Sequence, residues 1–158
     1  MTAPHERYRR FLESLTPESL PGLAEQVTPD VRFKDPFNDV RGVEAMGAVF
    51  AHMFETFGQV RFTVHHALAE DEVCLMAWRF ESRLRGKPWA FEGTSLLRFA
   101  ADGRVAEHSD YWDAARDFYE RFPVIGWPLA AARRALGRRS PNLPAQTPPA
   151  NPSGRGSS

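Results

Sequence analysis

The sequence predicts an α+β domain in which helices pack on one face of a curved antiparallel sheet. Two patterns support this prediction. Apolar residues recur at spacings of three and four in the first third of the chain, as they do in amphipathic helices. Four long runs rich in Val, Phe, Trp, Leu and Thr then follow between residues 60 and 113, with short turns between them. The length of 158 residues fits one domain with a substantial core.

The first third of the chain predicts three helices. Residues 5–15 place one apolar face at helical spacing, made of Tyr8, Phe11, Leu12 and Leu15. Thr16 and Pro17 mark the start of a second helix, which Pro21 should keep short or irregular. The third helix should begin after Gly42 and end at Gly58. Its apolar face comprises Val43, Met46, Val49, Phe50, Met53, Phe54 and Phe57.

The predicted strands begin with residues 31–34, which alternate apolar and polar side chains and lead into a turn cluster at 35–39. The four long strands should span residues 60–69, 73–85, 88–100 and 104–113. Gly86 and the Asp102-Gly103 pair are good hairpin turns between them. Residues 114–122 are expected to add one helical turn.

The C-terminal part differs from the rest in composition and charge. All 20 acidic residues lie at or before Glu120, so residues 1–120 carry 20 acidic and 14 basic groups, a net of −6, and the last 38 residues carry +6. Accordingly, residues 1–122 should form the α+β domain and 123–139 an apolar, basic helical segment with Leu129, Ala132 and Leu136 on one side. Residues 140–158 are rich in Pro, Ser, Gly and Asn and should be disordered.

The helical segment 123–139 has two interpretations. It could pack over the domain as a lid or dimer contact, or its Trp127 and four nearby arginines could bind an anionic membrane surface. Its apolar face is thin, so packing is favoured and membrane contact is the minority hypothesis.

Composition excludes several function classes. The formal net charge is zero and no basic stripe is interleaved with aromatic residues, which disfavours nucleic-acid binding. The single cysteine, Cys74, allows no intrachain disulfide, and the N-terminus has no apolar signal segment, so a cytoplasmic location is expected. Phosphate-binding, dinucleotide-binding and metal-ligand motifs are missing, so neither a cofactor nor a metal is expected.

Two short motifs resemble ketosteroid isomerase. The first is the strand ending in Asp35-Pro36, with Gly42 opening a helix a few residues later. The second is the last hairpin, in which Phe99, a turn at residues 102–104 and a strand ending in Tyr111-Trp112 keep the isomerase spacing. In architecture the resemblance covers about residues 5–113. It places the chain among nuclear transport factor 2-like proteins, which include isomerases, SnoaL-type polyketide cyclases, dehydratases and non-catalytic modules.

The resemblance implies a cone-shaped, curved antiparallel sheet with three N-terminal helices on its concave face, around one pocket for a small apolar molecule. Asp35 matches the isomerase's general base, and a carboxylate at the edge of an apolar cone would have a raised pKa. The alternative is that Asp35 only shapes its turn. Ser95 falls at the position of the strand donor that holds the reacting oxygen. Tyr8 matches the helix tyrosine if the second helix carries a three-residue insertion.

The last strand offers a second set of polar groups. If Trp112 points into the cone, as the resemblance implies, then Asp110 and His108 do too, because alternate residues of a strand share a face. His108 could act as acid or base near neutral pH, with Asp110 orienting it or acting as the base itself. Alternatively, the two side chains simply hydrogen-bond to each other or to the backbone.

The other pocket residues are expected on the walls. Phe50, Trp78 and Trp112 should contact the ligand, whereas Trp78 and its aromatic neighbours could equally be core or dimer contacts. His66 should point inward and His65 outward, since His66 shares parity with Val64. A homodimer through the sheet is expected.

Together these observations predict a cofactor-free isomerase, cyclase or dehydratase that acts on an apolar carbonyl compound by proton transfer. Asp35, His108 and Asp110 would carry the chemistry, and Tyr8, Phe50, Trp78, Ser95 and Trp112 would bind the substrate. The alternative is a ligand-binding or assembly module of the same fold.

Overall fold

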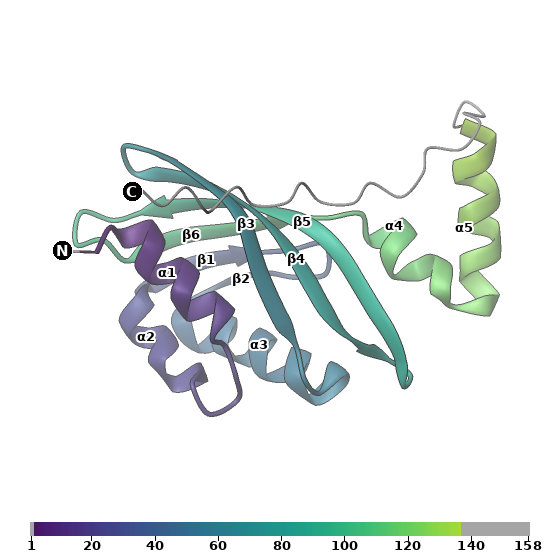
Figure 1. Cartoon of the computed structure of the whole chain (residues 1–158), viewed down its shortest axis with the longest axis horizontal. Coiled ribbons are helices and arrows are strands. Elements are labelled where there is room, and N and C mark those ends of the chain that lie inside the picture. Colours follow the sequence, from purple (N-terminus) through teal and green to yellow (C-terminus); the bar gives the residue numbers. More distant parts are fainter. Residues whose placement is uncertain (1, 137–158) are drawn as a thin grey trace, which may run out of the picture.

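The computed structural model describes residues 2–136 and contains one six-stranded sheet with helices on one side (Figure 1). In chain order the helical elements are α1 (Pro4–Glu13), the 3₁₀ turn η1 (Leu20–Gly22), α2 (Leu23–Gln26), α3 (Val43–Phe57), α4 (Ala114–Asp117), the 3₁₀ turn η2 (Tyr119–Arg121) and α5 (Pro123–Leu136). The strands are β1 (Val27–Lys34), β2 (Asp39–Arg41), β3 (Arg61–Glu70), β4 (Val73–Leu84), β5 (Lys87–Phe99) and β6 (Val105–Tyr111). The α+β prediction is therefore confirmed.

The sheet has the strand order β2-β1-β6-β5-β4-β3. Every neighbouring pair is antiparallel except β1 and β6, which run parallel and bring the two ends of the domain together. In this pair Phe33 lies opposite His108 and Lys34 opposite Ser109. One step further along the same register, Asp35 and Asp110 become neighbours at the end of both strands.

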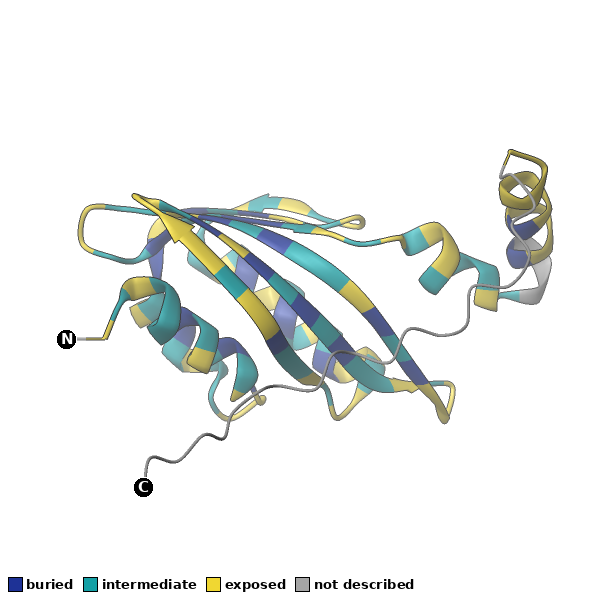
Figure 2. Cartoon of the chain, turned by 45° about the horizontal axis from the view of Figure 1, so that its top comes forward, coloured by how far each residue is buried: buried dark blue, intermediate teal, exposed yellow. Residues whose placement is uncertain are grey.

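The core lies between the concave face of the sheet and the three N-terminal helices. α3 buries Met46, Phe50 and Phe54, which are spaced four residues apart and therefore form one stripe along the helix. α1 buries Tyr8 and Leu12 in the same way. Along β4 the residues Cys74, Met76, Trp78 and Phe80 are buried while the residues between them are more exposed, a strand alternation visible in Figure 2.

Two local features differ from the sequence prediction. β1 begins at Val27, four residues early, because Val27 pairs with Val105 before an irregular stretch that ends at Arg32. β2 forms directly after the turn at 35–38 and pairs with the end of β1. Three residues of mixed exposure carry no pattern that could have announced this strand. The second helix is short and irregular, as Pro21 predicted.

His66 does not point inward, so that prediction was wrong. The β3–β4 register shifts between Val64 and His66, which leaves both histidines exposed and moves Ala67 opposite the buried Met76. A β-bulge of this kind reverses the parity of every later residue in the strand.

Beyond β6, α4 and η2 follow the end of the sheet, and α5 stands away from it (Figure 1). Leu129 and Leu136 on α5 are exposed, and Leu136 keeps 90% of its surface. The segment is helical over residues 123–136 and stands apart from the sheet rather than over it, whereas the dimer contact that was expected as the other form of packing stays a prediction. The segment contacts η2 through an ion pair between Arg133 and Glu120 at 2.6 Å. The last residues of this segment and the predicted disordered tail (140–158) lie outside the described residues.

Candidate active site

A cavity of about 750 Å³ opens between the concave face of the sheet and α3. This volume suits a compound of drug-like size. Its walls are mostly aromatic and come from β1, β3, β4, β5, α3 and the α4–η2 segment. The lining aromatic residues are Phe33, Phe37, Phe50, Phe57, Phe62, Trp78, Phe80, Trp89, Phe91, Trp112, Phe118 and Tyr119. The expected wall residues Phe50, Trp78 and Trp112 are among them.

One wall of the cavity is an aromatic cluster formed by the turn after β1 and the segment after β6. The ring of Phe37 makes edge contacts with Trp112, Phe118 and Tyr119 at centroid distances of 5.1 to 5.9 Å. The indole N–H of Trp89 donates to the Asp117 carbonyl at 2.7 Å and ties α4 to the sheet. The segment after β6 thus contributes Trp112, Phe118 and Tyr119 to the cavity wall.

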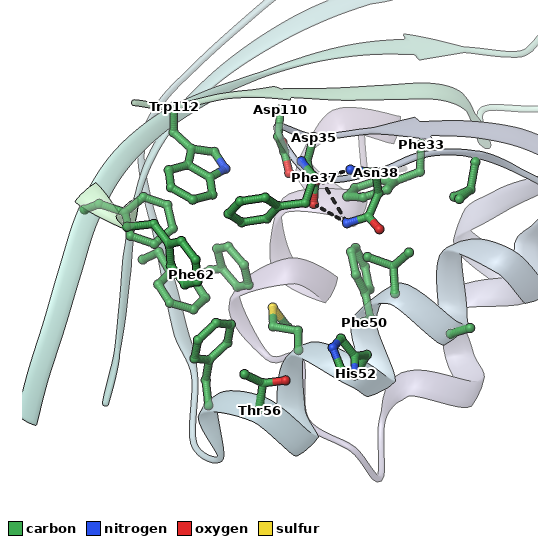
Figure 3. Close-up of a pocket in the computed structure, with 18 of the residues that line it drawn as sticks. Phe33, Asp35, Phe37, Asn38, Phe50, His52, Thr56, Phe62, Asp110 and Trp112 are labelled. Atoms are coloured by element: carbon green, nitrogen blue, oxygen red, sulfur yellow. Dashed lines mark hydrogen bonds between the residues drawn. The ribbon is translucent and has the colours of Figure 1, made fainter. Parts of the chain in front are cut away.

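Two carboxylates, Asp35 and Asp110, meet at one end of this apolar cavity, with Asn38 beside them (Figure 3). They come from the ends of β1 and β6, where the parallel register makes them neighbours. Thr56 and the exposed His52 lie toward the other end, on α3 (Figure 3). The lining includes no lysine or arginine among the described residues.

Asp35 is engaged in its own turn. Its Oδ1 accepts hydrogen bonds from the backbone N–H groups of Phe37 and Asn38 at 2.7 and 2.6 Å and from the Asn38 amide at 3.0 Å. The same amide reaches Oδ2 at 3.1 Å (Figure 3). Burial raises the pKa of Asp35 against the opposing effect of these donors, and the nearby Asp110 raises it further. Asp35 therefore both shapes the turn and lines the cavity.

Asp110 is held from the opposite side, at the centre of a buried chain of hydrogen bonds. His108 Nε2 lies 2.7 Å from Asp110 Oδ1, and the Ser95 hydroxyl donates to the same oxygen. Within residues 2–136 no hydrogen bond reaches Asp110 Oδ2. One oxygen is therefore saturated by the protein, and the other is available to a molecule in the cavity.

Each arm of this chain has an outer partner. The Tyr8 hydroxyl lies 2.8 Å from His108 Nδ1, and the Trp78 indole N–H donates to Ser95 Oγ at 2.8 Å. Tyr8, Ser95 and His108 are each at most 2% exposed. Polar groups buried this deeply are stable only when hydrogen-bonded, so the network fixes all five side chains.

Two of the residues that were expected to bind the substrate lie outside the cavity. Tyr8 and Ser95 do not line the cavity, and their hydroxyls already have partners inside the protein. His108 also lies behind the wall, against the ring of Phe33. Sequence parity placed His108 and Asp110 on one face, but it gave no sign that a tyrosine 100 residues away would complete the chain. Asn38, Phe37 and Tyr119 are lining residues that sequence reasoning missed.

Gly93 explains how Trp78 reaches Ser95. Gly93 lies directly opposite Trp78 in the β4–β5 pair, and a Cβ at this position would overlap the indole ring. The missing side chain lets the ring lie across β5, so that its N–H meets the hydroxyl two residues further along.

Comparison with known proteins agrees with this architecture. The family model of the SnoaL-like domain matches residues 8–108. An NTF2-like protein of unknown function from Burkholderia pseudomallei shares the fold with a TM-score of 0.65 and 19% identity, covering 73% of this chain and 94% of its own. A candidate SnoaL-like polyketide cyclase from Jannaschia sp. CCS1 has a TM-score of 0.62 and 20% identity, covering 70% and 85%.

An LEH-like epoxide hydrolase from M. tuberculosis has a TM-score of 0.58 and 17% identity, and covers 82% of this chain and 93% of its own. The curated proteins include no match. At these identities the solved structures establish the fold, and the functional argument rests on the site itself.

Proposed function

We propose that this chain, which belongs to the SnoaL-like domain family, is a cofactor-free enzyme that moves a proton on a small, largely apolar carbonyl compound. The observation that carries the proposal is Asp110, which lines an aromatic cavity: a buried network holds its Oδ1, and no described residue donates a hydrogen bond to its Oδ2. Isomerisation, cyclisation and dehydration of carbonyl compounds all begin with the removal of a proton from carbon, which such a base can perform.

In this proposal Asp110 Oδ2 takes a proton from the carbon next to the carbonyl. The electron pair of the broken C–H bond moves toward the carbonyl, and negative charge develops on its oxygen. Return of the proton to another carbon completes an isomerisation. In a cyclisation the new carbon nucleophile attacks a second carbonyl, and the proton held by Asp110 goes to the oxygen of that carbonyl. The aromatic walls exclude water, which strengthens the electrostatic interactions at the reacting end.

Asp35 is proposed as the group that stabilises the developing oxygen charge. We propose that Asp35 is protonated when the substrate binds, so that its Oδ2 donates a hydrogen bond to the substrate oxygen; burial and the nearby Asp110, which both raise the pKa of Asp35, act in this direction. This division of roles departs from the expectation that Asp35 is the first-choice base. Its Oδ1 already accepts three hydrogen bonds from the turn, whereas Asp110 offers a whole oxygen to the cavity.

The test is turnover of a panel of β,γ-unsaturated ketones, steroidal and smaller, by the full-length protein and by Asp110→Asn. We expect the substitution to lower kcat by about 10²-fold or more, because it removes the base and keeps the side-chain shape. Asp39→Asn is the matched control, since Asp39 is exposed on β2 and pairs with Arg32 outside the cavity. It should retain full activity.

Ketones that bind and are turned over equally by wild type and Asp110→Asn would refute the assignment of the base. Ketones that bind in the cavity without turnover would instead support the second candidate, a non-catalytic ligand-binding module. The engagement of Asp35 in its own turn is the observation that favours this alternative.

A further inference from the structure

The hydroxyl of Tyr8 has one hydrogen-bond partner among the described residues, His108 Nδ1, and it lies in a side chain that is only 1% exposed. His108 also has apolar neighbours. Leu97 is its cross-strand partner, and the rings of Phe33 and Tyr8 contact it edge-on. Tyr8 and Asp110 are therefore the groups that can decide where the imidazole carries its proton.

Two protonation states would bring a proton to the Nε2 side, facing Asp110. If the imidazole is neutral, Tyr8 donates to Nδ1, and Nε2–H donates to Asp110 Oδ1. If the imidazole is doubly protonated, Nδ1–H donates to the tyrosine oxygen, and the phenolic proton is left without an acceptor in a buried site. Burial and the charge of Asp110 raise the pKa of Tyr8, so the phenol keeps this proton. The neutral state alone gives every donor in the chain an acceptor.

We propose that Tyr8 is a positioning residue: by donating to Nδ1 it holds His108 neutral with its proton on Nε2, and His108 in turn holds Asp110 with Oδ2 directed at the substrate. The catalytic part of this inference rests on the proposed function, whereas the position of the proton on His108 does not. Tyr8 acts through His108 and is not among the residues that line the cavity.

The same logic applies to the second arm. Trp78 donates to Ser95, and Ser95 donates to Asp110 Oδ1. Both arms direct their protons to this one oxygen. The two oxygens of a carboxylate are equivalent, so a half-turn restores the same contacts, but any smaller rotation breaks them. The arms together therefore hold the plane of the carboxylate, with one oxygen in the network and the other outside it. The residues of this network come from four elements: α1, β4, β5 and β6.

The first experiment reads the histidine directly. Long-range ¹H–¹⁵N correlation spectra of the full-length protein distinguish the two neutral tautomers from the doubly protonated ring, and His108→Gln assigns the signal by its loss. We expect wild-type His108 to be neutral with the proton on Nε2. A proton on Nδ1, alone or together with Nε2, would overturn the proposal whether or not the protein is an enzyme.

The second experiment uses Tyr8→Phe, which keeps the ring and removes the donor. We expect the ¹⁵N resonance of His108 Nδ1 to shift, because Nδ1 loses its donor whereas Nε2–H keeps Asp110 as its acceptor. We also expect kcat on a panel ketone to fall about 10-fold or more while KM stays within about two-fold. Tyr111→Phe is the matched control, because Tyr111 is exposed on the opposite face of β6. It should change neither quantity. An unaltered His108 Nδ1 resonance in Tyr8→Phe would contradict the inference.

Two substitutions at His108 test the same proposal independently, in case Tyr8→Phe does not fold. His108→Gln can still donate to Asp110 Oδ1 from its amide, whereas His108→Leu cannot. The glutamine variant should therefore retain more activity than the leucine variant, and equal loss in both would count against positioning through this donor. Turnover that is absent from wild type, with the expected Nε2–H tautomer present, would reject the proposed function and leave the network assignment standing.

Discussion

Asp35 illustrates how one side chain can serve a turn and a site together. Its Oδ1 closes the turn at residues 35–38, and the backbone of that turn in turn presents Phe37 and Asn38 to the cavity. The sequence suggested both roles as alternatives. The structure shows that they are compatible, because a carboxylate has two oxygens and the turn occupies mainly one of them.

The raised pKa of Asp35 predicts a pH-dependent cost to stability. A carboxyl whose folded pKa lies above its unfolded value stabilises the fold most at low pH, and this contribution is lost as the pH rises through the folded pKa. Asp35→Asn keeps an oxygen acceptor for the turn and cannot ionise. The free energy of unfolding of wild type minus that of the variant should therefore fall as the pH is raised from about 4 to about 8.

Urea denaturation at a series of pH values measures this difference. Asp39→Asn is again the control, since its ion pair with Arg32 lowers the pKa of Asp39. Its contribution is present above the unfolded pKa and is lost only at lower pH, so the corresponding difference should not fall over the same range. A difference for Asp35→Asn that rises with pH would contradict the account.

At the scale of single residues, the sequence predicted which strand residues face the cavity but not the hydrogen bonds between them. Strand parity correctly placed Asp110 and Trp112 on the cavity face, because β6 is regular there. The same reasoning failed at His66, where a bulge inserts one residue into β3. Nothing local distinguishes a regular strand from a bulged one, and nothing local pairs Tyr8 with His108. Those contacts depend on how α1 is placed against the sheet.

At the scale of elements, the Trp78–Gly93 pair is the most sensitive contact between two strands near the site. Gly93→Ala would place a methyl group where the indole ring lies, so Trp78 or the backbone must move. We expect a loss of about 1–3 kcal/mol in the free energy of unfolding, which is typical of overpacking. The displaced indole should also lose its hydrogen bond to Ser95, which a change in tryptophan fluorescence would report.

Gly47→Ala provides the comparison on a helix. Gly47 lies inside α3, where a Cβ would make an ordinary contact with Leu23 at 4.0 Å. We expect this substitution to stabilise the protein by about 0.5–1 kcal/mol, because alanine favours the helix. Denaturation curves for both variants measure the two changes in the free energy of unfolding. A Gly93→Ala variant as stable as Gly47→Ala would show that the Trp78 ring does not require a glycine at position 93.

The helices and strands with the clearest periodic pattern of apolar residues were predicted most accurately. α1, α3 and the four long strands carry strong patterns and were found within a few residues of their bounds. β2 has three residues and no pattern, so it could not be recognised. The fate of residues 123–136 depended on geometry: α5 is a helix, as its composition predicted, but the direction in which the chain leaves α4 carries it away from the cavity (Figure 1).

At the scale of the whole molecule, one ion pair joins the basic C-terminal segment to the acidic domain. Arg133 of α5 forms a two-point ion pair with Glu120, the last acidic residue of the chain. Trp127 remains 75% exposed, and a dimer through the sheet stays a prediction. In the described part of the chain, no helix is both long and apolar enough to cross a membrane.

The fold and the cavity follow from the sequence because they depend on many apolar residues whose pattern is redundant. The proposed chemistry depends on a few polar residues that lie close together at the ends of β1 and β6, and a single register step would separate Asp35 from Asp110. This is why the family resemblance gave the architecture and the pocket, whereas the choice of Asp110 over Asp35 as the base required the hydrogen bonds themselves.

The most direct measurement is deuterium exchange at the carbon next to a carbonyl, followed by ¹H NMR in D₂O with 2-tetralone as the probe. It detects proton removal whether the natural reaction is an isomerisation, a cyclisation or a dehydration. We predict that wild type accelerates exchange above the buffer rate, that Asp39→Asn matches wild type, and that Asp110→Asn loses about 10²-fold or more of the acceleration. Binding of the ketone with equal exchange in wild type and Asp110→Asn would contradict the assignment of Asp110 as the base.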